Sequence, residues 1–281
     1  MTGRDAAYLD AHAPDPRRRP PAAAVAEMPR GGPHASWLDR RLETTVPEYT
    51  DRADVSENTK RKVIEALDRY GRFYRQHQAH AHTALASVSD IPAPRILELG
   101  AGHGTLSANI VKRHPTATMT VSDVDPASVA RIAASPLGSH PRVRAHRIDA
   151  TAIAADDDSY DLAVMSLGFH HLPPATAATA IAEATRVAGR FLVIDIKRPA
   201  PLMHLLQMVS VPAFLLGLAA VTGPSRAVPA IHDWMISSMR SYGRDGFVAL
   251  GEAADPYMDV QFLPPAHHFG PKPVNVLFAK R

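Results

Sequence analysis

The chain has 281 residues, of which 46% are hydrophobic and 21% charged, so it can form a globular core and is not globally disordered. Its formal net charge is only +3, and part of the basic excess lies in Arg17-Arg18-Arg19 rather than in a basic face with interleaved aromatic residues. We therefore expect no nucleic-acid partner. The absence of cysteine excludes disulfides, thiolate metal sites and a cysteine nucleophile.

Residues 1–33 are rich in proline and arginine, which is typical of a disordered tail. The first residues include Asp5 and Asp10 and have no apolar run, so they do not resemble a secretory signal. A cytoplasmic protein is therefore expected, with peripheral membrane contact only through the apolar segment described below.

Residues 34–90 show apolar side chains at helical spacing, and Asp54-Val55-Ser56 is a plausible helix start. The longest run of such side chains consists of Val55, Ile64, Leu67, Tyr70, Phe73 and Tyr74. This part is predicted to form an N-terminal helical cap.

From residue 91 onwards, short apolar stretches alternate with helical ones, which predicts βαβ units and a parallel sheet. The expected strands are 96–99, 117–124, 143–148, 160–165 and 191–196, and the expected helices are 106–113, 126–134 and 174–188. The last two strands, 258–263 and 274–279, are joined by a Pro- and Gly-rich loop too short to contain a helix. They must therefore form an antiparallel hairpin.

Residues 201–221 contain no charged side chain over about the length of a membrane span. A transmembrane helix would leave the last two strands on the wrong side of the bilayer, and Pro212 interrupts the segment. Three interpretations stay open: a substrate cap, a homodimer contact, or shallow membrane association. The segment belongs to an insertion at about 199–242.

The most informative motif follows the first strand, where PRILELGAGHG is succeeded by a helical stretch. Glycine accepts positive φ and has no Cβ, so such a turn lets a ligand approach the backbone closely. Dinucleotide-binding folds need G-x-G-x-x-G, and the third glycine of that pattern would fall on Thr105. The chain instead has G-x-G-x-G, with Glu98 two residues upstream, and this resembles motif I of the class I S-adenosylmethionine (SAM)-dependent methyltransferases.

The resemblance implies a Rossmann-like α/β fold with strand order 3-2-1-4-5-7-6, in which residues 91–281 form the SAM-binding domain. It implies SAM as cofactor and S-adenosylhomocysteine (SAH) as product. The residues expected at the methionine end of SAM are Glu98, Gly100, Ala101, Gly102 and Gly104.

In this family an acid at the end of the second strand receives the ribose hydroxyls, because a carboxylate can accept two hydrogen bonds. Asp123 and Asp125 compete for that role, and Asp125 is preferred because Pro126 then opens the next helix. The resemblance also assigns Asp149 and Ala150 to the adenine, although Asp149 could simply cap a loop. Ser166 is expected to contact the cofactor as well.

The fourth strand ends in SLGFHHLP, which resembles the motif IV region of small-molecule methyltransferases. It lacks the [D/N]-P-P-[Y/F] signature of enzymes that methylate exocyclic amines of bases. The pKa of histidine suits a base near neutral pH, so His170 and His171 are the candidate catalytic residues. The alternative is that they only shape the loop. Asp156-Asp157-Asp158 is interpreted as solvated surface, and no metal site is expected.

A second cluster lies at 231–242, and His232, Trp234, Arg240 and Tyr242 are its candidate substrate-binding residues. For Arg240 a surface salt bridge is an equally good interpretation. We expect methyl transfer from SAM to a small, fairly apolar molecule, on oxygen rather than carbon or nitrogen. The alternatives are a protein or RNA methyltransferase, or a SAM-binding fold that does not methylate.

Overall fold

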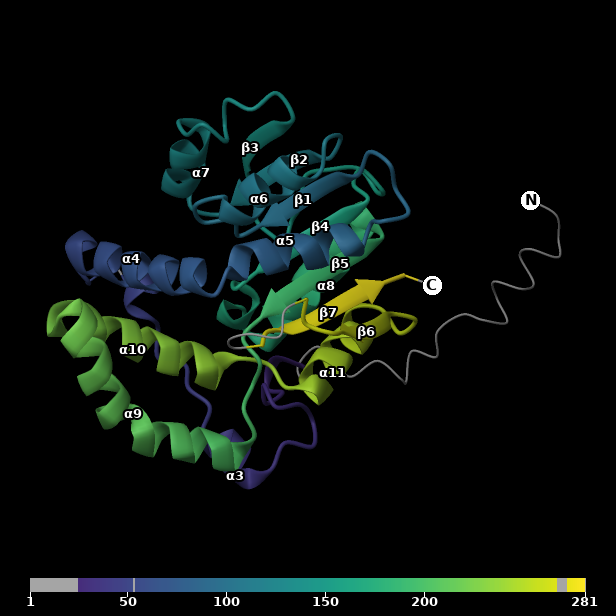
Figure 1. Cartoon of the computed structure of the whole chain (residues 1–281). Coiled ribbons are helices and arrows are strands. Elements are labelled where there is room, and N and C mark those ends of the chain that lie inside the picture. The colour runs from purple at the N-terminus through teal and green to yellow at the C-terminus, as the bar shows by residue number, and fades with distance from the viewer. Residues whose placement is uncertain (1–24, 53, 267–271, 281) are drawn as a thin grey trace, which may run out of the picture.

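A computed structural model describes residues 25–52, 54–266 and 272–280. Its centre is a seven-stranded sheet in the order β3-β2-β1-β4-β5-β7-β6, as predicted (Figure 1). The strands are β1 Arg95–Leu99, β2 Thr118–Asp123, β3 Val143–Arg147, β4 Leu162–Ser166, β5 Arg190–Asp195, β6 Asp259–Leu263 and β7 Val274–Ala279.

The pairing of the strands confirms the predicted mixture of parallel and antiparallel neighbours. β1 pairs in parallel with β2 and β4, and the parallel set extends to β3 and β5. β7 runs antiparallel to both β5 and β6. The carboxyl ends of β1 to β5 therefore meet along one edge of the sheet, where ligands of open α/β sheets bind.

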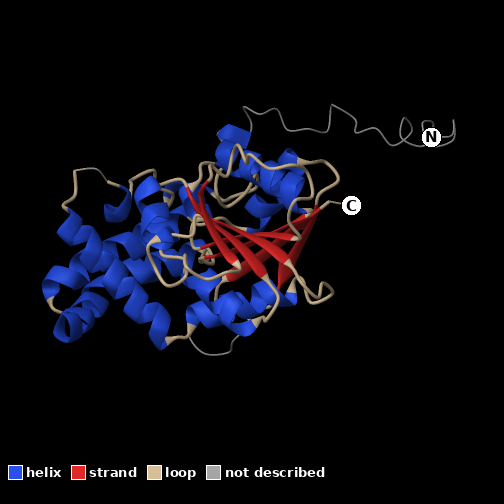
Figure 2. Cartoon of the chain, turned by 90° about the horizontal axis from the view of Figure 1, so that it is seen from above, coloured by secondary structure: helices blue, strands red, loops and turns tan. Residues whose placement is uncertain are grey.

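Helices cover both faces of this sheet (Figure 2). Alternate side chains of β1 explain why: Leu97 and Leu99 belong to one buried cluster, whereas Ile96 belongs to the other. The first face is covered by α8 and α11, and the second by α5, α6 and α7. These helices are α5 Gln76–Ala86, α6 Thr105–Arg113, α7 Pro126–Ala133, α8 Pro174–Ala188 and α11 Arg244–Ala254.

The remaining helices form a layer beside the sheet, in which α10 packs against both α4 and α9 (Figure 1). This layer contains α3 Trp37–Arg41, α4 Glu57–Phe73, α9 Pro201–Thr222 and α10 Pro224–Arg240. The predicted cap at 34–90 is therefore divided between two parts of the fold. α5 and the turn after it place Ala81, Ala84 and Val88 in the core beneath the sheet, so α5 packs as part of the domain that contains the sheet.

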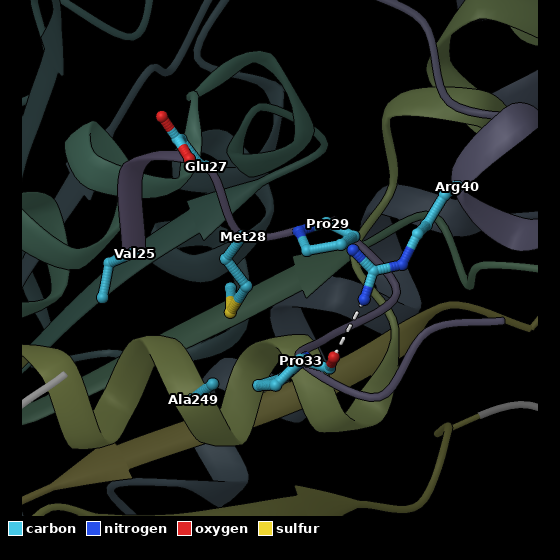
Figure 3. A pocket seen from close by; sticks show the side chains of 7 residues that line it. All are labelled: Val25, Glu27, Met28, Pro29, Pro33, Arg40 and Ala249. Atoms are coloured by element: carbon cyan, nitrogen blue, oxygen red, sulfur yellow. Dashed lines mark hydrogen bonds between the residues drawn. The ribbon is translucent and has the colours of Figure 1, made fainter. Parts of the chain in front are cut away.

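The segment 25–33 corrects the prediction of a disordered tail over 1–33, because it packs onto the domain. Val25 and Met28 are buried in the core cluster that contains α11. Arg30 donates hydrogen bonds to the carbonyls of His170 and Arg240 at 2.8 and 2.6 Å. Figure 3 shows Val25 and Met28 above Ala249 of α11, lining a small cavity. Residues 1–24 lie outside the described part of the chain.

The apolar segment 201–221 forms α9, which has Pro212 within it. Many of its large apolar side chains face solvent, with Leu202 and Val209 exposed to 75% and 78%. Among the described residues, no helix is both long and apolar enough to cross a membrane. Whether α9 serves as a substrate cap, a dimer contact or a membrane contact stays a prediction.

A buried ion pair fastens the N-terminal segment to the helical layer. The Arg198 side chain is only 4% exposed and lies 2.9 Å from Oδ1 of Asp39 and 3.2 Å from Oε1 of Glu43. Its guanidinium also donates to the carbonyls of Met239 and Ser241. Because so many partners meet here, the free energy of unfolding should depend strongly on this one side chain.

Replacing Arg198 by Leu should therefore lower the free energy of unfolding by about 3–5 kcal/mol, because Asp39 would be left buried without its partner. The measurement is urea unfolding followed by circular dichroism. The control is Arg61→Leu, which removes an exposed i,i+4 pair with Glu65 and should change stability by about 0.5 kcal/mol or less. Equal effects of the two substitutions would contradict a structural role for Arg198.

Candidate active site

The three predicted glycines form the tight turn that close approach of a ligand requires. Gly100, Gly102 and Gly104 have φ values of +64°, +54° and +70°, in a region that glycine adopts without steric cost. A Cβ atom on Gly100 or Gly102 would meet nothing in the described part of the chain within 4 Å, whereas one on Gly104 would meet Leu137 at 2.6 Å. The backbone at the first two glycines is therefore open to a ligand.

Glu98 lies in β1 directly before this turn and is only 3% exposed. Its carboxylate accepts hydrogen bonds from the backbone N–H and the hydroxyl of Ser107, in the first turn of α6. Burial raises the pKa of Glu98 to about 7, although the bonds from Ser107 act in the opposite direction. Glu98 thus ties the N-terminus of α6 to β1 and shapes the turn, while a direct contact with SAM stays a prediction.

Asp123 and Asp125 have different local tasks. Asp123 ends β2, and its two oxygens accept from the N–H of Gly102 and of Asp125, both at 2.9 Å. Asp125 is the N-cap of α7, and its oxygens accept from the N–H of Ala127 and of Ser128, both at 3.0 Å. Both carboxylates are thus engaged by backbone N–H groups, and only Asp123 bonds directly to the glycine turn. Which of the two receives the ribose hydroxyls stays a prediction.

The other predicted cofactor residues follow β3 and end β4. The Oδ1 atom of Asp149 accepts from the N–H and the hydroxyl of Thr151, at 2.9 and 2.7 Å, so Asp149 does stabilise a local turn. Ala150 is half-buried beside it. The Ser166 hydroxyl lies 2.8 Å from Nδ1 of His80 in α5. These residues share the carboxyl edge of the sheet with the glycine turn, and their contact with SAM stays a prediction.

His170 is buried between two carboxylates. Its Nδ1 donates to Oδ1 of Asp195 at 2.7 Å, and its Nε2 lies 3.4 Å from Oε1 of Glu48. Its backbone N–H donates to the other oxygen of Asp195, also at 2.7 Å. Burial alone would lower the pKa of His170, but Asp195 and Glu48 outweigh it and raise the pKa to about 9. At neutral pH the ring is thus protonated, which argues against the predicted role of His170 as a base.

His171 is the more accessible of the two histidines, with 30% of its side chain exposed. Its Nδ1 lies 3.0 Å from Oδ2 of Asp51, and its Nε2 lies 3.9 Å from Oε2 of Glu48. Arg240 donates to the same Asp51 oxygen at 3.2 Å and to the carbonyl of His171 at 3.0 Å. His171 is therefore positioned by two charged neighbours and still reaches the surface of the site.

The short segment Tyr49–Asp51 carries Asp51 and follows Glu48, and it is held onto α10 by Asp233. The carboxylate of Asp233 accepts from the N–H of Tyr49 at 2.7 Å and of Thr50 at 3.3 Å. Glu48 is further fixed by the Ser237 hydroxyl at 2.7 Å. The catalytic cluster, meaning Glu48, Asp51, His170, His171 and Asp195, thus draws on three separate parts of the chain.

The loop that presents both histidines has an unusual backbone at its start. Leu167 directly follows β4 and has φ of +58°, which is uncommon for a residue with a Cβ. Its N–H donates to the carbonyl of Ile194 in β5 at 2.8 Å. This conformation turns the chain out of the sheet into the short helix Phe169–His171, which carries the histidines.

Of the predicted substrate-binding residues, two are occupied by structural contacts. Tyr242 is buried, and its hydroxyl donates to the carbonyl of Leu172 at 2.8 Å, so it is a core residue. Arg240 forms the bonds to Asp51 and His171 described above. His232 lies against the Tyr49 ring with centroids 4.3 Å apart, and Trp234 lies 5.9 Å from the Phe214 ring. His232 and Trp234 are half-buried and stay candidates.

Comparisons with known proteins agree with this fold. Residues 96–189 match a family model described as a methyltransferase domain. The plantazolicin methyltransferase BpumL in complex with SAH is similar at 15% identity and a TM-score of 0.54, covering 92% of this chain and 98% of that one. The SAM-dependent methyltransferase SibL is similar at 19% identity and a TM-score of 0.54, covering 98% and 72%.

A chain from Rhodobacter sphaeroides, provisionally described as a Zn-dependent alcohol dehydrogenase, is similar at 14% identity and a TM-score of 0.52, covering 72% of this chain and 89% of that one. At such identities the likeness concerns the fold alone. No curated protein sequence matches the chain.

The matched segment spans β1 to β4 and α8, and it includes the glycine turn and the histidine loop. With the strand order, it defines an α/β domain of the methyltransferase type. Residues 96–189 match a methyltransferase domain, and the chain has the fold of class I SAM-dependent methyltransferases, so SAM is the cofactor that the domain implies. The residues present fit this cofactor, because the backbone at Gly100 and Gly102 is open where a ligand would approach.

The raised pKa of Glu98 predicts a pH dependence of stability in the protein without SAM. Between about pH 4.5 and pH 7 the unfolded chain releases this proton while the folded chain retains it. The folded state therefore loses stability as pH rises through this window, by on the order of 2 kcal/mol from pH 5 to pH 8. Glu98→Gln removes this contribution, so the free energy of unfolding of the variant relative to wild type should rise between pH 5 and pH 8. The measurement is urea unfolding of both proteins at the two pH values. An equal change in the free energy of unfolding for both proteins would contradict the raised pKa of Glu98.

Proposed function

We propose that this protein transfers the methyl group of SAM to an oxygen atom of a small, fairly apolar molecule. The observation that carries the proposal is the catalytic cluster at the carboxyl end of β4. β4 is the hydrogen-bonded neighbour of β1, and Leu99, which precedes the glycine turn, pairs with Met165. The group that would receive a proton thus lies one strand away from the turn that would bind the methyl donor.

For the cofactor, we assign the methionine end to the turn formed by Gly100, Ala101, Gly102 and Gly104, supported from behind by Glu98. The ribose hydroxyls are assigned to Asp123, whose present partner is the N–H of Gly102 within the same turn. The adenine is assigned to Asp149 and Ala150, and the remaining cofactor contact to Ser166.

The reaction is an in-line displacement, so alignment and the exclusion of water supply much of the catalysis. An electron pair of the acceptor oxygen forms the new O–CH₃ bond while the S–CH₃ bond of the sulfonium breaks and leaves neutral SAH. The proton of the acceptor hydroxyl passes to the catalytic cluster. His171 is the member assigned to receive it, because it is partly exposed and its Nδ1 is already oriented by Asp51.

The apolar character of the acceptor is inferred from the insertion at 199–242. Its helices α9 and α10 bring Phe214 and Trp234 together. Segment 48–51 lies between α10 and the histidine loop, through the contacts to Asp233 and His171. The α10 side chains that reach the cluster itself, such as Arg240, are charged or polar, so it is the Phe214–Trp234 pair of the insertion that favours a phenol-like acceptor over a highly charged one.

The test of this function is SAH release from the full chain, SAM and a panel of phenols and carboxylic acids. We expect acceptor-dependent SAH formation with at least one phenol, and mass spectrometry should place the added methyl group on oxygen. Micromolar SAM binding without SAH formation across a broad panel would contradict the proposal and favour a SAM-binding fold that does not methylate.

The role of His171 is tested by His171→Ala, assayed with the acceptor that responds best. Turnover should fall roughly a hundredfold or more if His171 receives the proton, while the affinity for SAM stays close to wild type. The matched control is His82→Ala, which removes an exposed histidine of α5. Unchanged turnover in His171→Ala would leave His171 with a structural role only.

The ribose assignment is tested by comparing Asp123→Asn with Asp125→Asn by titration calorimetry with SAM. Loss of a charged hydrogen-bond acceptor should weaken SAM binding about tenfold or more in Asp123→Asn. Asp125→Asn should bind SAM nearly as well as wild type, since Asn also caps helices well. The opposite order would return the ribose role to Asp125.

A further inference from the structure

We propose that Glu48, His170 and His171 form a binding site for a divalent transition-metal ion of the Zn²⁺ type. One potential ligand atom from each residue lies within 4.8 Å of the other two. The two Nε2 atoms face the same carboxylate, at 3.4 Å for His170 and 3.9 Å for His171. Glu48 reaches the histidine loop from the N-terminal segment, so only the folded chain assembles this set.

The distances suit a small tetrahedral ion. Bonds of roughly 2.0–2.1 Å to nitrogen and oxygen place neighbouring ligand atoms about 3.4 Å apart. The His170–Glu48 separation already has this value, and the three ligand atoms, which lie within 4.8 Å of one another, would draw closer together around the ion. Two imidazoles and one carboxylate are ligands that bind zinc and neighbouring first-row metals, and three protein ligands leave a fourth position for another group.

Each histidine is also oriented as a metal ligand would be. Nδ1 of His170 is bonded to Asp195 at 2.7 Å, and Nδ1 of His171 is bonded to Asp51 at 3.0 Å. A carboxylate on one ring nitrogen orients the ring and directs the other nitrogen towards the metal, which binds its lone pair and releases to solvent any proton held there. The pairs Asp195–His170 and Asp51–His171 thus both face the carboxylate of Glu48.

A second observation points into the same space. The Nε2 atom of His170 is fully buried, and its one described approach, to Glu48 at 3.4 Å, lacks the geometry of a hydrogen bond. Its side chain is only 3% exposed. A buried polar atom without a hydrogen-bond partner is costly, and a metal ion between His170, His171 and Glu48 would satisfy it.

The ion would also have a role in the proposed methyl transfer, namely activation of the acceptor hydroxyl. This role rests on the proposed function, whereas the metal site itself does not. His171 is 30% exposed, so the fourth position lies on the accessible side of the cluster. An acceptor hydroxyl bound there would lose its proton to solvent more readily, because a bound dication lowers the pKa of a ligand oxygen. In the metal-loaded enzyme, the ion would replace His171 as the group that activates the acceptor.

Metal binding is tested directly, without an acceptor. The full chain is stripped with a chelator and titrated with Zn²⁺ by calorimetry, and with Co²⁺ followed by visible absorption. We expect one Zn²⁺ per chain with a dissociation constant in the micromolar range or below, and a Co²⁺ spectrum typical of tetrahedral coordination. Zn²⁺ should also raise the melting temperature, since it binds only the folded site.

Variants then locate the ion. Glu48→Gln and His171→Asn each remove one ligand and should weaken Zn²⁺ binding by about a hundredfold or more, whereas Asp51→Asn should weaken it by about 10–100-fold. His82→Asn is the matched control and should bind as wild type does. His171 is partly exposed, so His171→Asn should stay folded, which circular dichroism verifies.

The inference is overturned if wild type binds Zn²⁺ no more tightly than His171→Asn, or if His82→Asn weakens binding as much. Its failure is separable from failure of the proposed function. If the chelator-treated enzyme methylates phenols but binds no Zn²⁺, the proposed function stands and the metal site is wrong. If the protein binds one Zn²⁺ per chain but methylates no acceptor, the metal site stands and the proposed function is wrong.

Discussion

The contact of His170 with Asp195 and Glu48 holds the active site of this protein together. Asp195 ends β5, His170 follows β4, and Glu48 comes from the N-terminal segment. Glu48 and Asp195 are both buried, so their carboxylates would repel each other and remain poorly solvated unless a cation stood between them. The protonated ring of His170 supplies that positive charge, and its pKa is raised to about 9 because the two carboxylates favour the charged form.

This contact explains why the N-terminal part belongs to the fold. Residues 25–52 run across the histidine loop, and Arg30 bonds the carbonyl of His170 while Glu48 faces its ring. Asp233 of α10 fixes the backbone just after Glu48. The active site is therefore closed by a segment that precedes the SAM-binding domain in sequence, and its geometry depends on the helical layer formed by α4, α9 and α10.

The sequence predicted the sheet and the glycine turn because both depend on local patterns. The terminal hairpin and helices such as 174–188 follow from apolar periodicity and loop length, whereas the strand order was implied by the family resemblance alone, and each is confirmed. The spacing could not show that Asp125 caps α7 while Asp123 bonds the glycine turn, and the choice between them for the ribose stays a prediction. The tail over residues 1–33 was predicted from their average composition, which gives no weight to single apolar residues such as Val25 and Met28. The side chains of these two residues pack into the core.

The partners of the histidines could not be predicted. His171 and Asp51 are 120 positions apart, and no local pattern marks a lone glutamate such as Glu48 as the neighbour of a distant loop. Asp195 ends a buried strand, which is a weak signal that could have been noticed, because a buried acid needs a partner. The pairing itself arises only when β4 and β5 lie side by side.

If the glycine turn and the catalytic cluster face one reaction space, a crystal structure with SAH will show the ligand above Gly100 and Gly102. Its ribose hydroxyls should lie at Asp123, and its sulfur should be directed towards His171. SAH bound elsewhere, or with its sulfur directed away from the cluster, would show that the turn and the cluster do not share a reaction space.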